Sequence, residues 1–314
     1  MNHKVSVIGT GRMGSALATA LQNKGFSTMV WNRTPSKTEA LARLGLRVAP
    51  SLESAALASD VIIVNVTDYG VTQQLLQVPG VAAALAGKIL VQLSSGIPQE
   101  ARNMESWARQ RDICYLDGAI MSYPSGIGAP ECTIFYSGSE EVFNRVKPVL
   151  MVLGGNTLFV GTEIGHASAL DLSGLTFVLG AMFGFVQGYI VSEAEGLRPE
   201  VFIGSIKGLL PVTGEILEAI SARIQRKDYA GSEATLDAWS VGPKELIEWS
   251  KDRRMDRRIA DAQIGLFEQA IKDGQGHRDF AYLYEIFKRK VENAAGAGDK
   301  SAAGLRRISR LDVQ

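Results

Sequence analysis

The sequence KVSVIGTGRMG spans residues 4–14. Its first half is a run of β-branched and apolar residues that ends in glycine, which is typical of a buried parallel strand. Its second half has the pattern G-x-G-x-x-G, and the apolar positions after Gly14 have helical spacing. A strand, this glycine pattern and a helix in that order predict a dinucleotide-binding turn.

Each glycine of this turn has an expected task. Gly9 permits the tight turn, Gly11 lets a pyrophosphate approach the backbone, and Gly14 lets the helix pack on the strand. The N-terminus of the helix attracts the phosphate charge. The residues expected around the pyrophosphate are Gly9, Thr10, Gly11, Arg12, Met13 and Gly14. A glycine-rich turn without a ligand is the alternative.

The end of the second predicted strand, Thr28–Trp31, indicates which dinucleotide binds. An NAD site usually has an Asp or Glu here that binds the ribose 2′-hydroxyl. This chain instead has Asn32, Arg33 and Thr34, with Lys37 one turn later. A guanidinium can hold a 2′-phosphate through two parallel hydrogen bonds, so the sequence predicts NADPH. The alternative is that Arg33 and Lys37 are ordinary surface cations. Further expected cofactor contacts follow later strands, at Val66, Thr67 and Ser95.

Strands and helices alternate along the first half of the chain. Apolar runs predict further strands at Val61–Val66, Ile89–Leu93 and Ile113–Leu116. Because helical spacing separates these runs, the alternation predicts an α/β domain with a doubly wound parallel sheet. The alternation stops near Gly161. Beyond it, amphipathic patterns predict an all-helical part, with helices such as Glu215–Arg226, Lys244–Ala270 and Phe280–Glu292.

Composition limits the class of protein. The 314 residues include 33 Lys and Arg against 33 Asp and Glu, so no net charge favours nucleic acid or an acidic membrane. Cys114 and Cys132 are too few for a disulfide framework or a four-ligand zinc site. His, Cys and carboxylate residues show no metal-site spacing, so no metal is expected. The N-terminus lacks the features of a signal peptide, and a cytoplasmic protein is predicted.

Residues 172–192 carry no charged side chain, and about 20 apolar residues can cross a bilayer. Polar side chains interrupt the run, however, and no Lys- or Arg-rich flank orients it as a membrane span. A helix that is apolar on all sides also occurs in protein cores, and we predict this second case. Gly180, Gly184 and Gly188 recur every four residues, which would let another helix approach closely.

The glycine turn followed by Asn32-Arg33-Thr34 resembles the β-hydroxyacid dehydrogenase superfamily, the relatives of 6-phosphogluconate dehydrogenase. Later motifs are similar to those of NADPH-dependent imine reductases and reductive aminases. They are GAIMSYP at 118–124, IGAP at 127–130, FYSG at 135–138, GTE at 161–163 and GHASALDL at 165–172. The resemblance extends to about residue 290.

This resemblance implies a Rossmann domain at residues 1–163, an interdomain helix at 164–192 and a helical domain for dimerisation and substrate binding at 193–292. The Gly- and Ala-rich segment 293–314 is expected to be a mobile tail. The resemblance also implies a homodimer whose chains exchange their helical domains, so that each active site draws on both chains. A helix at the centre of such a dimer is covered on all sides, which would account for its apolar composition.

Asp171 lies where hydroxyacid dehydrogenases of this superfamily carry a lysine. Reduction of a ketone builds negative charge on oxygen, which a cation stabilises. No Lys occurs between Lys147 and Lys207, and a carboxylate opposes such charge but attracts an iminium cation. Imine reductases have Asp or Tyr here, so the resemblance implies that Asp171 is a proton donor or cation stabiliser. Alternatively, Asp171 caps the helix or joins a buried ion pair, and Tyr123 or Tyr189 supplies the proton.

The resemblance also implies a substrate pocket built from both halves of the chain. Its expected residues are Met121, Ser122, Tyr123, Leu175, Leu179, Ile216 and Trp239. Reductive aminases often have Asn at the position of Ser95, Tyr at that of Leu179, and Trp and Gln at those of Ile216 and Trp239. These departures make the pocket more apolar and favour simple imine reduction over reductive amination, which must also hold a free amine. Trp239 could stack on a cyclic iminium, or it could be a core or interface residue.

The predicted activity is therefore NADPH-dependent reduction of the C=N bond of cyclic imines or iminium ions to amines. A β-hydroxyacid dehydrogenase or ketoreductase that uses another acid is the first alternative. A non-catalytic NADPH-binding sensor is the second, and the pocket departures are its support. The expected partners are a small imine or carbonyl substrate and a second copy of the chain.

Overall fold

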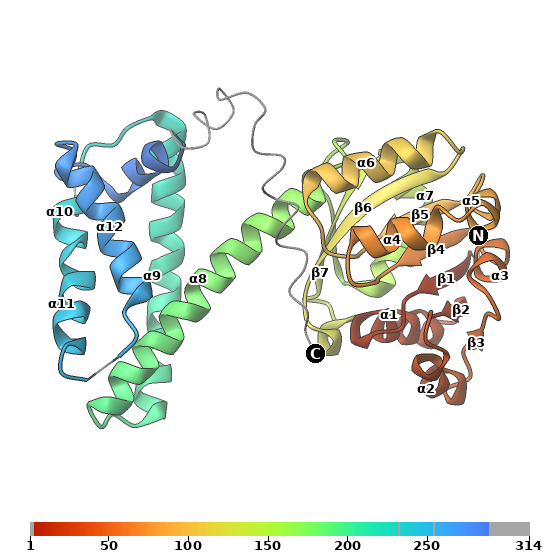
Figure 1. The fold of residues 1–314 in the computed structure, drawn as a ribbon, viewed down its shortest axis with the longest axis horizontal. Helices are drawn as coiled ribbons and strands as arrows, with labels where there is room; N and C mark the ends of the chain where they lie inside the picture. Colours follow the sequence, from red (N-terminus) through yellow and green to blue (C-terminus); the bar gives the residue numbers. More distant parts are fainter. Residues whose placement is uncertain (1–2, 232, 254, 289–314) are drawn as a thin grey trace. The chain divides into compact units, whose positions relative to one another are not determined.

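The computed structural model describes residues 3–231, 233–253 and 255–288. The chain divides into two compact units, residues 1–181 and 182–314, each of which is described by itself (Figure 1). This partition cuts the long helix between the two units, so the segment boundaries expected at 163, 192 and 292 stay predictions. The predicted mobile tail at 293–314 lies outside the described residues.

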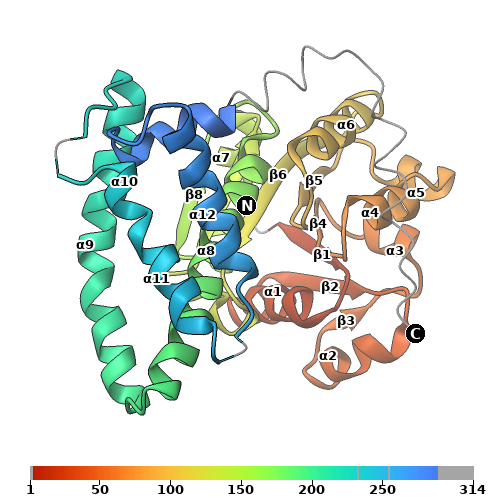
Figure 2. The same cartoon turned by 60° about the vertical axis from the view of Figure 1, so that its left-hand side comes forward.

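The first unit is built on an eight-stranded sheet in the order β3-β2-β1-β4-β5-β6-β7-β8. The strands are β1 (Lys4–Ile8), β2 (Ser27–Trp31), β3 (Arg47–Val48), β4 (Val61–Val64), β5 (Ile89–Gln92), β6 (Cys114–Met121), β7 (Thr133–Gly138) and β8 (Asn156–Phe159). All neighbouring strands are parallel except β6 and β7. Figure 2 shows β2, β1, β4, β5 and β6 side by side. The predicted doubly wound α/β fold is confirmed.

Helices cover both faces of this sheet. On one face lie α1 (Arg12–Asn23) and α7 (Glu140–Leu153), and on the other lie α3 (Leu52–Leu57), α4 (Tyr69–Leu76), α5 (Pro79–Ala84) and α6 (Pro98–Arg109). Shorter elements complete the unit: η1 (Pro35–Thr38), α2 (Glu39–Arg43) and η2 (Pro124–Gly126). The sequence analysis predicted five of the eight strands: it left out β3, β7 and β8, and β6 is longer than predicted.

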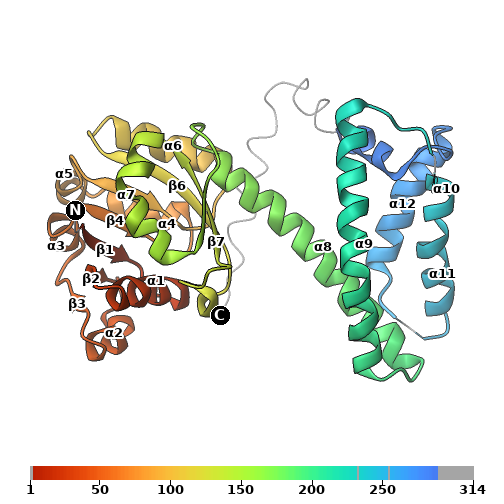
Figure 3. The ribbon, with the colours of Figure 1, turned by 180° about the vertical axis from the view of Figure 1, so that it is seen from behind.

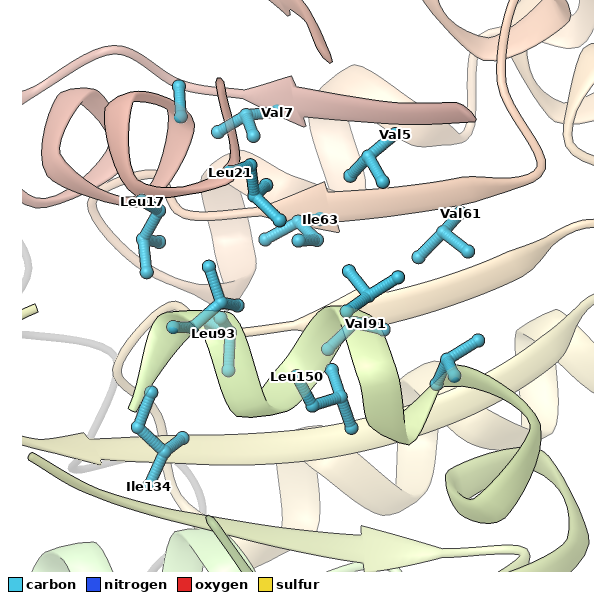
Figure 4. Packing of buried hydrophobic residues seen from close by; sticks show 14 of the residues in the cluster. Val5, Val7, Leu17, Leu21, Val61, Ile63, Val91, Leu93, Ile134 and Leu150 are labelled. Carbon is cyan, nitrogen blue, oxygen red and sulfur yellow. The ribbon is translucent and has the colours of Figure 1, made fainter. Parts of the chain in front are cut away.

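The central strands are apolar at almost every position because both of their faces are buried. Ile63 and Val91 belong to the cluster that includes Leu21 of α1 and Leu150 of α7 (Figure 4). Their neighbour Ile62 belongs to the cluster on the opposite face. This packing fixes the register of the parallel strands, so the loops after β1, β4 and β5 all emerge at the carboxyl edge of the sheet.

The second unit is helical, as predicted. It contains α9 (Pro199–Arg226), α10 (Leu236–Trp239), α11 (Val241–Ser250), α12 (Arg258–Lys272) and η3 (Phe280–Tyr282). Figure 3 shows α9, α12 and α11 running side by side. Their apolar faces share one cluster, which includes Leu236, Phe267 and Tyr282.

The single helix predicted at Lys244–Ala270 is wrong, because α11 ends at Ser250 and α12 begins only at Arg258. The carboxylate of Asp256 accepts a hydrogen bond from the backbone N–H of Arg258 at 3.0 Å. It also pairs with the guanidinium of that arginine at 2.6 Å. Asp256 thus satisfies a backbone donor at the start of α12, and the two helices are separate.

The long helix α8 (His166–Ala194) contributes to both units. By length and composition it could cross a membrane, as could the core helix of many proteins, and none of its most apolar window is buried within this chain. Phe183, for example, is 57% exposed. Gly180 and Gly184 face open space, whereas Gly188 packs against α9. The described part of one chain does not cover α8, and its burial at the centre of a dimer stays a prediction.

Candidate active site

The glycine turn lies between β1 and α1, at the carboxyl edge of the sheet. Gly9 has φ +95°, and a Cβ there would collide with the carbonyl oxygen of Asn65. A Cβ on Gly14 would collide with the carbonyl oxygen of Gly9. At Gly11, by contrast, a Cβ would meet no atom within 4 Å. Packing therefore requires the first and third glycines, while the second leaves the backbone open to a ligand.

The start of α1 fits an anionic group beside this opening. Gly11 is the N-cap residue, so no capping side chain accepts hydrogen bonds from the first amides of α1. The first turn of α1 also contains no acidic residue. Unpaired amides at the positive end of a helix bind phosphate groups. The open backbone at Gly11 and these amides together fit the pyrophosphate of a dinucleotide.

A cavity of about 310 Å³ extends from this turn to the end of β2. It brings together most of the predicted cofactor residues. They are Gly9, Gly11, Arg12, Met13, Asn32, Arg33, Thr34, Lys37, Val66 and Thr67, with Trp31, Asn65, Val71 and Leu75. Arg33 and Lys37 are exposed, and neither forms an ion pair with any described carboxylate. Both cations are therefore available to an anionic ligand such as a 2′-phosphate.

Asn32 has a structural task within this cavity that the sequence did not indicate. Its Oδ1 accepts a hydrogen bond from the backbone N–H of Thr10 at 3.0 Å, and its Nδ2 donates to the carbonyl oxygen of Thr34 at 3.1 Å. The hydroxyl of Thr10 donates to the carbonyl oxygen of Lys37 at 3.1 Å. These bonds tie the glycine turn to the segment that carries Arg33, so both walls of the cavity are held together.

A second cavity, of about 250 Å³, shares Met13, Asn65 and Val66 with the first. Its other lining residues are Leu93, Ser94, Ser95, Gly96, Gly118, Ala119, Ile120, Ser168 and Asp171. Asn65 Nδ2 donates to the carbonyl oxygen of Leu93 at 2.6 Å, and Ser94 Oγ accepts from the N–H of Val66 at 2.9 Å. The loops after β4 and β5 therefore hold each other, and the shared residues connect the cofactor cavity to Asp171.

Asp171 is half-buried in the second turn of α8. It is the one charged side chain among the described residues that line the second cavity. Burial raises the pKa of its carboxyl above the usual value. Because α8 begins at His166, Asp171 does not cap the helix, and it makes no ion pair within the described residues. Neither structural alternative for Asp171 is met in the chain.

A second carboxylate, Asp117 of β6, is fully buried behind this cavity and was not predicted. Its Oδ1 accepts a hydrogen bond from the hydroxyl of Tyr69. Its Oδ2 accepts from the backbone N–H of Ser168 at 3.2 Å and from the Ser168 hydroxyl at 2.7 Å. Burial raises the pKa of Asp117 to about 6, against the opposing effect of these hydrogen bonds, and the negative charge of Asp171 adds to the rise. The one signal in the sequence was an acidic residue directly after the apolar run Ile113–Leu116.

The remaining predicted pocket residues lie in two places. In the first unit, a Cβ built on Gly174 would come within 2.7 Å of Met121 Cε, so Met121 packs on α8 close to Asp171. Tyr123 is 71% exposed, and Ser122, Leu175 and Leu179 are also at least partly exposed. In the second unit, Ile216 and Trp239 line a separate cavity of about 480 Å³. Trp239 stacks edge-on against Phe280 there, with ring centroids 5.9 Å apart.

Comparison with known proteins covers both units. Residues 4–161 match the NAD-binding domain of 6-phosphogluconate dehydrogenase, and residues 163–289 match the C-terminal domain of the NADPH-dependent reductive aminase-like proteins. The chain belongs to the imine reductase and reductive aminase family. Within the described residues, no three His, Cys, Asp or Glu side chains gather as metal ligands.

Individual imine reductases and reductive aminases are similar over almost the whole chain. An NADPH-dependent reductive aminase from Aspergillus oryzae is 30% identical over 92% of this chain and 98% of its own length. The imine reductase from Myxococcus stipitatus, solved with NADP+, is 44% identical with a TM-score of 0.85, covering 90% of this chain and 99% of that one. The reductive aminase from Aspergillus terreus, solved with NADPH and ethyl levulinate, is 30% identical with a TM-score of 0.85, covering 91% and 100%. The predicted family and enzyme class are confirmed.

Proposed function

We propose that this imine reductase family member uses NADPH to reduce the C=N bond of small, preferably cyclic, imines to amines. The observation that carries the proposal is Asp171, the one charged side chain among the described residues of the cavity next to the cofactor cavity. Asn65 and three serines add uncharged polar groups to the same lining, and its other residues are glycines or apolar. Such a pocket suits a compact substrate whose charge lies on one atom.

The charge on the reacting group determines what Asp171 can assist. The chemistry that NADPH supplies when bound is hydride transfer to the C=N carbon. Reduction of a ketone would build negative charge on oxygen, which a nearby carboxylate opposes. An iminium ion is instead attracted to Asp171, by a few kcal/mol at about 4 Å. Burial raises the pKa of Asp171, so its protonated form persists to higher pH and can also give a proton to a neutral imine nitrogen.

The activity is tested by supplying purified protein with NADPH and a panel of cyclic imines, with a β-keto acid assayed separately. We expect amine formation coupled to NADPH oxidation. NADPH oxidation with the keto acid but with none of the imines would favour a hydroxyacid dehydrogenase or ketoreductase. NADPH binding without turnover of any imine would favour a sensor and would contradict the proposed activity.

The proposed NADPH preference rests on Arg33 and Lys37 at the cofactor cavity. Arg33→Ala removes charge-assisted hydrogen bonds worth about 1.5–3 kcal/mol, so we expect the NADPH over NADH ratio of kcat/KM to fall about 10- to 100-fold. Arg43→Ala is the matched control, because Arg43 is exposed on α2 and pairs with Glu39 at 3.5 Å, away from the cavity. An unchanged ratio in Arg33→Ala would mean that Arg33 does not bind the 2′-phosphate.

The proposed partner is a second copy of the chain that covers α8. The described residues leave the apolar surface of α8 uncovered, and Gly180 and Gly184 leave room for a close helix. Leu209 and Leu210 of α9 are also exposed, at 56% and 62%. An exposed apolar surface of this extent marks an interface. The family resemblance adds the proposal that both chains build each active site, with Ile216 and Trp239 contributed by the helical unit.

Light scattering coupled to size-exclusion chromatography tests this assembly. We expect twice the 33.8 kDa mass of the chain. Gly184→Leu, which places a bulky side chain in the open space at Gly184, should shift the mass toward that of one chain and reduce turnover with it. A wild-type mass of one chain with full activity would contradict the shared site.

We propose the cytoplasm as the compartment. Cys114 is half-buried, Cys132 is buried, and both are free thiols. Free thiols without a disulfide are typical of a reducing environment.

A further inference from the structure

Asp117 and Asp171 are linked through one turn of α8. Ser168 and Asp171 are three residues apart, so they lie on the same side of the helix, and both line the second cavity. Two hydrogen bonds from Ser168 to Asp117, at 3.2 and 2.7 Å, anchor that turn to β6. The carboxylate of Asp117 therefore fixes the backbone from which the side chain of Asp171 extends.

The surroundings of Asp117 determine how its charge acts. The neighbouring strands place Gln92 of β5 and Ser137 of β7 beside it, and neither titrates. The packed elements carry several titratable or charged groups: Tyr69 on α4, Tyr115 on β6, Glu100, Arg102, Glu105 and Arg109 on α6, and His166 and Asp171 in the first two turns of α8. Of these, Tyr69 and Asp171 act on Asp117 directly, whereas Glu105 acts on Tyr115 and Arg102 lies against Gly165.

We propose that Asp117 is a positioning residue for the reduction: it anchors Ser168, and thereby the turn of α8 that carries Asp171, and its negative charge helps to retain the proton that Asp171 shares with the substrate nitrogen. This inference rests on the proposed role of Asp171 and identifies a residue outside the cavity lining that acts on it. Asp117 touches neither substrate nor cofactor in this account, since it is fully buried.

The direction of the charge effect follows from the ionisation of Asp117. Its pKa is about 6, so it is negatively charged at neutral and alkaline pH. That negative charge favours a protonated imine paired with ionised Asp171 over the neutral imine. The proton of this pair is therefore lost at a higher pH than it would be without Asp117. The alkaline fall of the kcat–pH profile therefore occurs at a higher pH than it would without the charge of Asp117.

Asp117→Asn tests the charge while preserving the size of the side chain and an oxygen that can accept from Ser168. We expect the alkaline limb of the kcat–pH profile for a cyclic imine to move to lower pH by about one unit. The Kd for NADPH, measured by fluorescence titration, should stay unchanged. Ser137→Ala is the matched control. The Ser137 hydroxyl also binds the segment that leads into α8: it donates to the carbonyl oxygen of Ile164 at 2.8 Å and accepts from the N–H of Ala167 at 3.1 Å. Because this hydroxyl carries no charge, the alkaline limb of the Ser137→Ala profile should not move.

The inference would be overturned if kcat of Asp117→Asn falls on the alkaline side at the same pH as kcat of the wild type, whether or not the maximum kcat is lower. Asp117 would then be a purely structural residue. If Asp117→Asn does not fold, Ser168→Ala and Ser168→Thr replace it. Loss of the hydroxyl should lower kcat about tenfold, and threonine, which restores the hydroxyl, should recover most of it. Equal activity in both variants would overturn the anchoring role. A wild-type protein that reduces no imine would instead refute the proposed function. The two failures can be told apart, because the first is seen in the wild type and the second only in the Asp117 and Ser168 variants.

Discussion

Asp171→Ala is expected to lower kcat for imine reduction by about 10²- to 10⁴-fold, the usual contribution of a positioned acid or base. The Kd for NADPH should stay within about twofold, because Asp171 lines the second cavity and not the cofactor cavity. Steady-state kinetics with a cyclic imine and fluorescence titration of NADPH measure the two effects separately.

Two further variants make this result specific to the carboxylate. Asp171→Asn keeps the size of the side chain but can neither hold a negative charge nor release a proton, so it should be nearly as inactive as alanine. Glu163→Ala removes an exposed carboxylate just before α8 that does not line the second cavity, and it should behave as the wild type. Turnover retained in Asp171→Ala would refute the assignment and direct attention to Tyr123 or Tyr189 as the proton source.

Gly11→Val is expected to weaken NADPH binding strongly without unfolding the protein. A Cβ at this position would meet no atom within 4 Å, so the melting temperature should be close to that of the wild type. The valine methyl groups would occupy the space left for the pyrophosphate. We expect the Kd for NADPH to rise about 10- to 100-fold or more, the equivalent of a 1–3 kcal/mol steric penalty.

Gly14→Ala provides the contrast, because its Cβ would collide with the carbonyl oxygen of Gly9. That variant should lose stability as well as NADPH binding. Unaltered NADPH affinity in Gly11→Val would show that the open backbone at this glycine is not where the cofactor binds.

The sheet and the cofactor turn were predictable because local sequence determines them. Apolar runs such as residues 61–64 are buried on both faces, and a glycine with positive φ at position 9 follows from the tight turn between strand and helix. The resemblance then indicated Asp171 and the long helix. Short edge strands such as β3 were missed because two residues carry no periodic signal.

Features that depend on distant partners were not predictable. Asp117 is buried because Tyr69 and Ser168, 48 and 51 residues away in the sequence, supply its hydrogen bonds. The task of Asn32 depends similarly on Thr10, which lies 22 residues earlier. The break between α11 and α12 was missed for a different reason: Asp256 binds the backbone only two residues away, but the apolar spacing on either side of it suggested one continuous helix.

The central claim is that Asp171 makes this site selective for C=N over C=O. A competition assay tests it most directly: the enzyme receives limiting NADPH with equal concentrations of a cyclic imine and a β-keto acid, and the amine and hydroxy acid are quantified by mass spectrometry. We predict amine as the dominant product in the wild type, and loss of that product in Asp171→Ala. Hydroxy acid as the dominant wild-type product would contradict the account, because a carboxylate in this cavity should oppose its formation.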